Sequence, residues 1–170
     1  MNATPLTDTY AREAIRLIGR SLRTAVARGD RRDARYDMSI GSLHAAISLA
    51  NAEVGAVHAL AYPLEGQFNV PHGIANGILF PHIMEFNVPG DVAKFVEIAA
   101  LLGEPVECLS PVEAAYRSVE AVKNLLRDID MPTTLTELNI PRSAIPEMAA
   151  ASINVTRLMA NNPRRMTAKD

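Results

Sequence analysis

The sequence has no tryptophan, only 5% aromatic residues and a single cysteine, Cys108, among its 170 residues. One cysteine cannot form an internal disulfide, which excludes a small secreted scaffold held together by disulfides. The first residues have neither the basic start nor the apolar run of a signal peptide. We therefore expect a protein of the reducing cytoplasm.

Blocks of like charge and long apolar runs are also missing. Seventeen Lys and Arg against 19 Asp and Glu give a net charge of −2 and a pI of 6.1, so we expect no nucleic-acid partner. No run reaches the roughly 18 consecutive apolar residues that a membrane span needs, so we expect a soluble chain with no membrane partner. What is present is a large apolar fraction, 48% against 21% charged residues. This balance excludes a disordered chain and is typical of one domain with its own core.

Helix signals occur along the whole chain. Thr4 and Pro5 form a cap and first position typical of a helix over residues 5–28. Asp91 caps a helix that runs to Gly103, and Ser110-Pro111-Val112-Glu113 is a capping box that begins another. A last helix is predicted over residues 146–160. Because no segment alternates β-branched and polar residues, the sequence predicts an all-α, multi-helix bundle: one all-helical domain over residues 1–160 and a loose, polar C-terminal tail over residues 161–170.

The segment from Tyr36 to Ala61 carries apolar residues at alternating spacings of four and three. This pattern predicts one long helix that Pro63 ends. The other faces of the segment are rich in Ala, Ser and Gly, so neighbouring helices could approach from several sides. We interpret it as the central helix of the bundle. Residues 62–70 are predicted to form a loop, after which Pro71 begins a helix that Pro81 should kink or divide.

The chain has four histidines, His44, His58, His72 and His82. On one continuous helix His44 and His58 would lie about 21 Å apart, too far to share a metal ion. His58 and His72 can meet, because the predicted loop can fold the chain back. Sites that bind a metal firmly have three or four ligands, and two imidazoles are fewer than that. From spacing alone, the two histidines could be either core residues or metal ligands. We interpret His44 as a core residue whose polar atoms have hydrogen-bond partners. His82 could cap a helix or contact a metal ligand without binding the metal itself.

Three runs of sequence resemble the signature of the iron-containing (group III) alcohol dehydrogenases. They are Gly55-Ala56-Val57-His58-Ala59-Leu60-Ala61-Tyr62-Pro63-Leu64, Asn69-Val70-Pro71-His72-Gly73-Ile74-Ala75-Asn76 and Leu79-Phe80-Pro81-His82-Ile83-Met84-Glu85-Phe86-Asn87. Residues 5–8, 13–18 and 162–164 extend the resemblance over nearly the whole chain. A signature of this length is far more specific than a short motif.

The resemblance implies a C-terminal helical domain that faces a nucleotide-binding domain across a cleft. In the family a divalent metal, Fe(II) or Zn(II), is bound there by one aspartate and three histidines, and it polarises an oxygen for hydride exchange with NAD(P). His58 and His72 match two of the three histidine ligands. Tyr62 stands where many members have a histidine near the nicotinamide, which makes it a candidate cofactor-binding residue. Glu65 stands where a second glycine is common, and we interpret it as a solvated loop charge.

The resemblance also has gaps. The family's ligand aspartate and remaining histidine have no counterpart in this sequence, and no glycine-rich turn follows a strand to hold a pyrophosphate. We therefore expect no catalytic residue in this chain, no activity of the chain alone, weak Fe(II) or Zn(II) binding, and NAD(P) binding only with a partner domain. The expected partner is a separate nucleotide-binding chain or a second copy. Two alternatives stay open: a non-catalytic helical oligomerisation or interaction module, and one subunit of a split enzyme.

Overall fold

The computed structural model describes residues 2–170, which form eight α-helices, two short 3-10 helices and no strand, so the all-α prediction is confirmed. No helix in this range is long and apolar enough to cross a membrane. The α-helices are α1 (Pro5–Ala27), α2 (Arg32–Ala52), α3 (Ala56–Phe68), α4 (His72–Asn87), α5 (Val92–Leu101), α6 (Pro111–Asp128), α7 (Ile145–Ile153) and α8 (Thr156–Ala160). The 3-10 helices are η1 (Val88–Gly90) and η2 (Arg142–Ala144).

The helix starts with local capping signals lie where the sequence predicts them. The Thr4 hydroxyl accepts the N–H of Thr7, and the Thr7 hydroxyl accepts the N–H of Thr4. Ser110 and Glu113 form the same reciprocal pair at the start of α6. These bonds satisfy backbone donors that would otherwise lack a helical partner.

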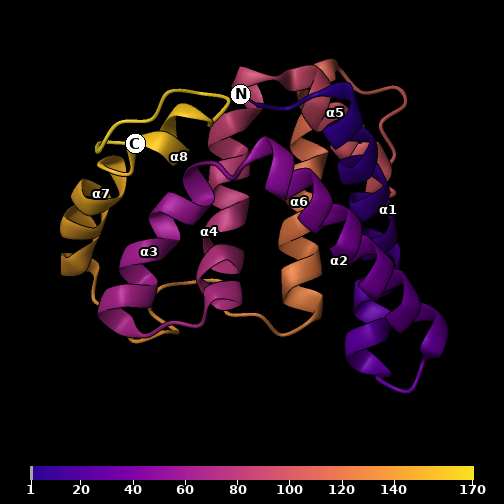
Figure 1. Ribbon diagram of the computed structural model, residues 1–170, viewed down its shortest axis with the longest axis horizontal. Coiled ribbons are helices and arrows are strands. Elements are labelled where there is room, and N and C mark those ends of the chain that lie inside the picture. Colours follow the sequence, from indigo (N-terminus) through magenta and orange to yellow (C-terminus); the bar gives the residue numbers. More distant parts are fainter. Residues whose placement is uncertain (1) are drawn as a thin grey trace.

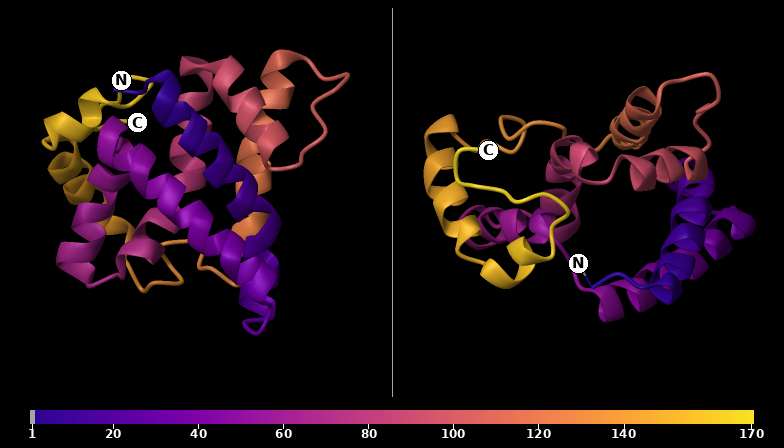
Figure 2. Two further views of the ribbon diagram at one scale, coloured as in Figure 1. Left: turned by 45° about the vertical axis from the view of Figure 1, so that its right-hand side comes forward. Right: turned by 90° about the horizontal axis from the view of Figure 1, so that it is seen from above.

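Helix α4 occupies the centre of the bundle, between α3 and α6 (Figure 1). Helices α7 and α8 pack on α3, whereas α5 packs on α6 and on α1, and α2 packs on α1. Seen from above, the helices follow an arc with α7 at one end and the α1–α2 pair at the other (Figure 2). Two hydrophobic clusters meet along α4: Ala75 and Ile78 contribute to the cluster with α3 and α7, and Met84 contributes to the cluster with α5 and α6.

The predicted central role of the segment from Tyr36 to Ala61 is therefore wrong. Helix α2 buries only Ala34 and Gly41, and the side chains of Tyr36 and Leu43 are exposed by 68% and 54%. Of the periodic apolar residues, Ile40 and Ile47 are only half-buried, and full burial is reached at Ala61 in α3. Periodicity identified the helix correctly, but it did not show which element would cover each face.

The segment is also two helices rather than one. Helix α2 ends at Ala52, Glu53 adopts a left-handed φ of 62°, and Gly55 precedes the start of α3. The amide of Asn161 donates to the carbonyls of Ala52 and Val54 at 2.9 and 3.2 Å. The break is thus stabilised by a residue more than 100 positions away, which no local sequence pattern reveals.

Two prolines lie inside helices instead of ending them. Pro63 is buried within α3, and Pro81 is buried within α4, which it does not divide. Helix α3 ends only at Phe68, because Asn69 adopts a left-handed φ of 52° and its N–H bonds to the carbonyl of Glu65. The predicted loop over residues 62–70 is therefore mostly helix, and Glu65 is a helical residue.

The C-terminal segment differs from its prediction in two respects. The helix predicted over residues 146–160 is divided into α7 and α8 at Asn154–Val155. The first residues of the expected tail are not loose, since Asn162 is buried and exchanges two amide hydrogen bonds with Asn87 of α4. The guanidinium of Arg164 lies 4.2 Å from the ring centroid of Phe86 and donates to its carbonyl. The segment therefore packs on the end of α4.

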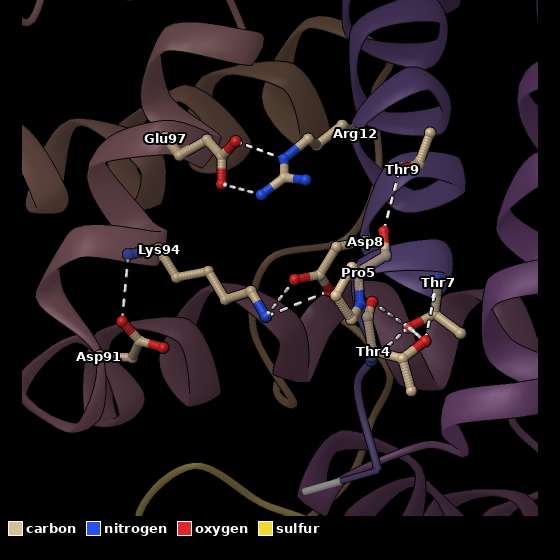
Figure 3. A network of polar contacts seen from close by, with 9 residues as sticks. All are labelled: Thr4, Pro5, Thr7, Asp8, Thr9, Arg12, Asp91, Lys94 and Glu97. Carbon is tan, nitrogen blue, oxygen red and sulfur yellow. Dashed lines mark hydrogen bonds and ion pairs between the residues drawn. The ribbon is translucent and has the colours of Figure 1, made fainter.

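Ion pairs between α1 and α5 reinforce the other side of the bundle (Figure 3). The Lys94 ammonium lies 3.0 Å from Asp8, and Arg12 forms a two-pronged pair with Glu97. Asp91 caps α5 by accepting the N–H of Lys94. These contacts are partly exposed, so each contributes little to stability. The two ion pairs connect α1 to α5 at Asp8 and Arg12.

Candidate metal centre

The structure brings His58 and His72 together at the junction of α3 and α4. His58 is the third residue of α3 and His72 is the first residue of α4. Their ring centroids are 5.4 Å apart, and the ring planes are inclined by 50°. His58 is half-buried, whereas 59% of the His72 side chain is exposed. The turn at Asn69–Pro71 reverses the chain and makes this contact possible.

The spacing of the two rings fits a shared metal ion. A metal–nitrogen distance of about 2.1 Å and a tetrahedral angle place the centroids of two ligating imidazoles roughly 5 Å apart. The observed separation is close to that value. Neutral imidazole is also a donor that both iron and zinc accept. Within residues 2–170, however, no group of three or more His, Cys, Asp or Glu side chains is arranged to hold a metal. The two histidines therefore fit as part of the ligand set of a metal ion, and not as a complete set.

Glu65 and Asn76 surround His72. Glu65 lies two helical turns after His58 on the same face of α3, and its Oε1 is 2.7 Å from Nδ1 of His72. Asn76 lies one turn after His72 on α4 and donates to its backbone carbonyl at 2.9 Å. The same amide nitrogen is 3.3 Å from each ring nitrogen of His72. The orientation of the His72 ring is thus fixed from both helices.

His58 is held in its neutral form. Burial lowers the pKa of His58 below its ordinary value of 6.5, and the nearby charge of His72 lowers this pKa further. The carboxylate of Glu65 opposes both effects by raising the pKa. Because a metal binds the unprotonated ring, a lowered pKa favours the form that can act as a ligand.

Tyr62 lies one turn after His58 on α3 and is 46% exposed. It lines a hollow of about 250 Å³ between α3 and α7, together with Ala59, Gly66 and Ser152. The side chain is therefore accessible beside the histidine pair.

The other two histidines lie apart from this pair. His44 is on α2, its ring packs edge-on against Tyr10 at 5.4 Å, and its buried Nδ1 has no hydrogen-bond partner within residues 2–170. The interpretation of His44 as a core residue is wrong, because His44 is only half-buried. His82 is exposed on α4, about 15 Å along the helix axis from His72.

The contact of Glu65 with His72 is not expected from the sequence. The interpretation of Glu65 as a solvated loop charge is wrong, because Glu65 is helical, 71% shielded at its side chain and bonded to His72. The error follows from ending the helix at Pro63. A helix that continues through Pro63 places residues 58 and 65 on one face, and this spacing would have indicated the contact.

Comparison with known protein families shows which family the chain is related to. The family model described as Fe-containing alcohol dehydrogenase family, C-terminal, matches residues 1–170. The chain belongs to this family. Its sequence is 41% identical over 170 residues to long-chain-alcohol dehydrogenase 1 of Geobacillus thermodenitrificans, an alignment that covers 100% of the chain and 43% of that protein. It is 40% identical over 164 residues to 1,3-propanediol dehydrogenase of Klebsiella pneumoniae, covering 96% of the chain and 42% of that protein.

Solved structures of the Fe-containing alcohol dehydrogenase family share the fold. The crystal structure of a 1,3-propanediol oxidoreductase superposes with a TM-score of 0.96 at 39% identity, covering 99% of the chain and 44% of that protein. The chain thus corresponds to the helical C-terminal domain of these enzymes and spans less than half the length of the curated relatives that it matches.

Proposed function

We propose that His58 and His72 supply two of the ligands of a divalent metal ion, Fe(II) or Zn(II), in an alcohol dehydrogenase that exchanges hydride between an alcohol or carbonyl compound and NAD(P). The observation that carries this proposal is the 5.4 Å separation of the two rings. Membership of the Fe-containing alcohol dehydrogenase family supports the choice of metal and reaction.

The residues of this chain contribute binding and orientation to that reaction. When bound, the metal polarises the substrate oxygen as a Lewis acid. His58 presents an unprotonated nitrogen because burial disfavours its cationic form. The ring of His72 is held by contacts from Glu65 and Asn76. Tyr62, accessible one turn from His58, is proposed to contact the nicotinamide cofactor.

Two histidines are too few for firm metal binding, because iron and zinc sites have three or four protein ligands. We therefore propose that the remaining ligands and the pyrophosphate-binding turn come from a nucleotide-binding segment or a separate chain. Without it, the 170-residue chain should bind metal weakly and should not oxidise alcohols.

A helical interaction module is the second candidate function. It is favoured by the exposed apolar side chains of Tyr36 and Leu43, which lie seven residues apart on one face of α2. Such a face tends to be covered by another protein surface. Sedimentation at micromolar concentration should show self-association, and a strictly monomeric profile would count against this candidate.

Zinc competition titrations test the metal proposal. His58→Ala and His72→Ala should each lower the affinity of the chain for Zn(II) by at least about tenfold, because each removes one of two donors. His44→Ala is the matched control and should leave the affinity unchanged, because His44 packs against Tyr10 on another part of the fold. Equal behaviour of the three variants, with their helical circular dichroism intact, would refute the proposal.

A further inference from the structure

The contact between Glu65 and His72 connects the end of α3 to the start of α4. The carboxylate oxygen Oε1 lies 2.7 Å from Nδ1, and the side chain of Glu65 is only 29% exposed. Glu65 is placed in the last turn of α3 by the left-handed residue Asn69, whose N–H bonds to the Glu65 carbonyl. The contact is therefore built into the junction of the two helices rather than made by a freely moving surface charge.

We propose that Glu65 is a positioning residue that fixes the tautomer of His72. An ionised carboxylate can only accept hydrogen bonds, so Nδ1 of His72 must be the donor in this contact. A neutral imidazole carries one proton, which leaves the lone pair on Nε2. Glu65 thus selects Nε2 as the metal donor of His72. This inference rests on the proposed metal-binding function.

Asn76 does not select between the two tautomers of His72. Its amide nitrogen donates to the His72 carbonyl at 2.9 Å and lies 3.3 Å from both Nδ1 and Nε2. An atom at equal distance from the two nitrogens lies over the face of the ring, out of line with either lone pair. The contact with Glu65 is therefore the one that sets the tautomer.

Glu65 is better suited to this indirect role than to direct ligation. Its carboxylate is engaged with His72, and residues 2–170 contain no three-residue group arranged to hold a metal. A carboxylate that accepts the second N–H of a ligating histidine fixes the ring orientation and makes the donor nitrogen more basic. Loss of such a partner typically lowers metal affinity by about 10- to 100-fold.

The first experiment measures the tautomer in the metal-free 170-residue chain. Long-range proton–nitrogen correlation spectra at about pH 8, where histidines are neutral, should show His72 protonated on Nδ1. Glu65→Ala should shift His72 toward the Nε2–H form. Glu65→Gln should keep the Nδ1–H form, because its amide oxygen accepts the same bond. An unchanged tautomer in Glu65→Ala would overturn the inference.

The second experiment compares Zn(II) affinities. Glu65→Ala should weaken binding by about 10- to 100-fold, and Glu65→Gln should weaken it less. Glu85→Gln removes the same charge from an exposed site on α4 that pairs with Lys123, and it should leave the affinity unchanged. If Glu65→Gln abolished binding while preserving the His72 tautomer, Glu65 would be a ligand and the positioning role would be wrong.

The two measurements separate this inference from the proposed function. If neither His58→Ala nor His72→Ala changed the zinc affinity, the proposed metal site would be refuted, whatever the tautomer of His72. Reduced affinity in both histidine variants, together with an unaffected Glu65→Ala, would preserve the metal site and refute the role of Glu65.

Discussion

The imidazole rings of His58 and His72 lie 5.4 Å apart although they belong to different helices. At this distance the protonated form of one ring disfavours protonation of the other. Burial of His58 acts in the same direction, and its pKa lies below 6.5. The lowered pKa of His58 thus reduces the stability of the fold in mild acid.

The first prediction concerns that pH dependence. Because the pKa of His58 is lowered by folding, the unfolded chain binds more protons as the pH falls below 6.5. The contribution of neutral His58 to the free energy of unfolding is fully present above pH 6.5. It is lost as the pH falls through the lowered pKa of His58. Urea unfolding at about pH 7.5 and 5.5 should show a smaller loss of stability for His58→Gln than for the wild-type chain. Carboxylates with lowered pKa values, such as Asp37 and Glu113, titrate below this window. An identical loss in both proteins would contradict the prediction.

The second prediction concerns the contact of α1 with α2. A Cβ atom at Gly41 would lie 2.9 Å from Cγ1 of Ile18 and 3.3 Å from Cβ of Leu17. Gly41→Ala should therefore destabilise the chain by about 1–3 kcal/mol, despite the better helix propensity of alanine. Gly66 of α3 has no atom within 4 Å of the same position, so Gly66→Ala should stabilise the chain by up to about 1 kcal/mol. Thermal unfolding of the two variants should show opposite signs, and a common sign would contradict the packing described.

The third prediction concerns the buried amides of Asn87 and Asn162. Their reciprocal hydrogen bonds measure 2.9 and 2.7 Å. Asn87→Ala leaves Oδ1 of Asn162 without its donor, and Asn162→Ala leaves both polar atoms of the Asn87 amide without their partner. Each variant should therefore cost about 1–3 kcal/mol. The double variant should cost less than the sum of the two. A double-mutant cycle in urea measures this coupling, and strictly additive losses would argue against the paired amides.

The parts of the fold that the sequence predicts are those with local causes. Helices α1 and α6 begin at capping boxes, in which both partners lie within four residues. The apolar period also identified α2 and the first part of α3, up to Ala61, as helical. The break between them could not be predicted, because the carbonyls of Ala52 and Val54 are satisfied by Asn161 from the far end of the chain. The central position of α4 likewise depends on packing between elements distant in sequence.

In the candidate site, too, some features could be predicted from the sequence and others could not. His58 and His72 could be singled out because they stand in a long signature shared with a family. Glu65 departs from that signature, so its contact with His72 depends on knowing that α3 continues through Pro63 to Phe68. Asn76 lies within the signature, but its bond to the His72 carbonyl emerges only from the geometry of α4. Side chains that contact the two signature histidines are thus less visible in the sequence than the histidines themselves.

The most direct test of the account is a titration of the 170-residue chain with Zn(II), followed through the ring nitrogen signals of all four histidines. The signals of His58 and His72 should shift together along one saturation curve, with one zinc ion per chain, while those of His44 and His82 stay in place. In His58→Ala, the His72 shift should largely disappear at the same zinc concentrations. A shift of His72 that is unaffected by the loss of His58, or separate curves for the two histidines, would contradict a shared metal ion.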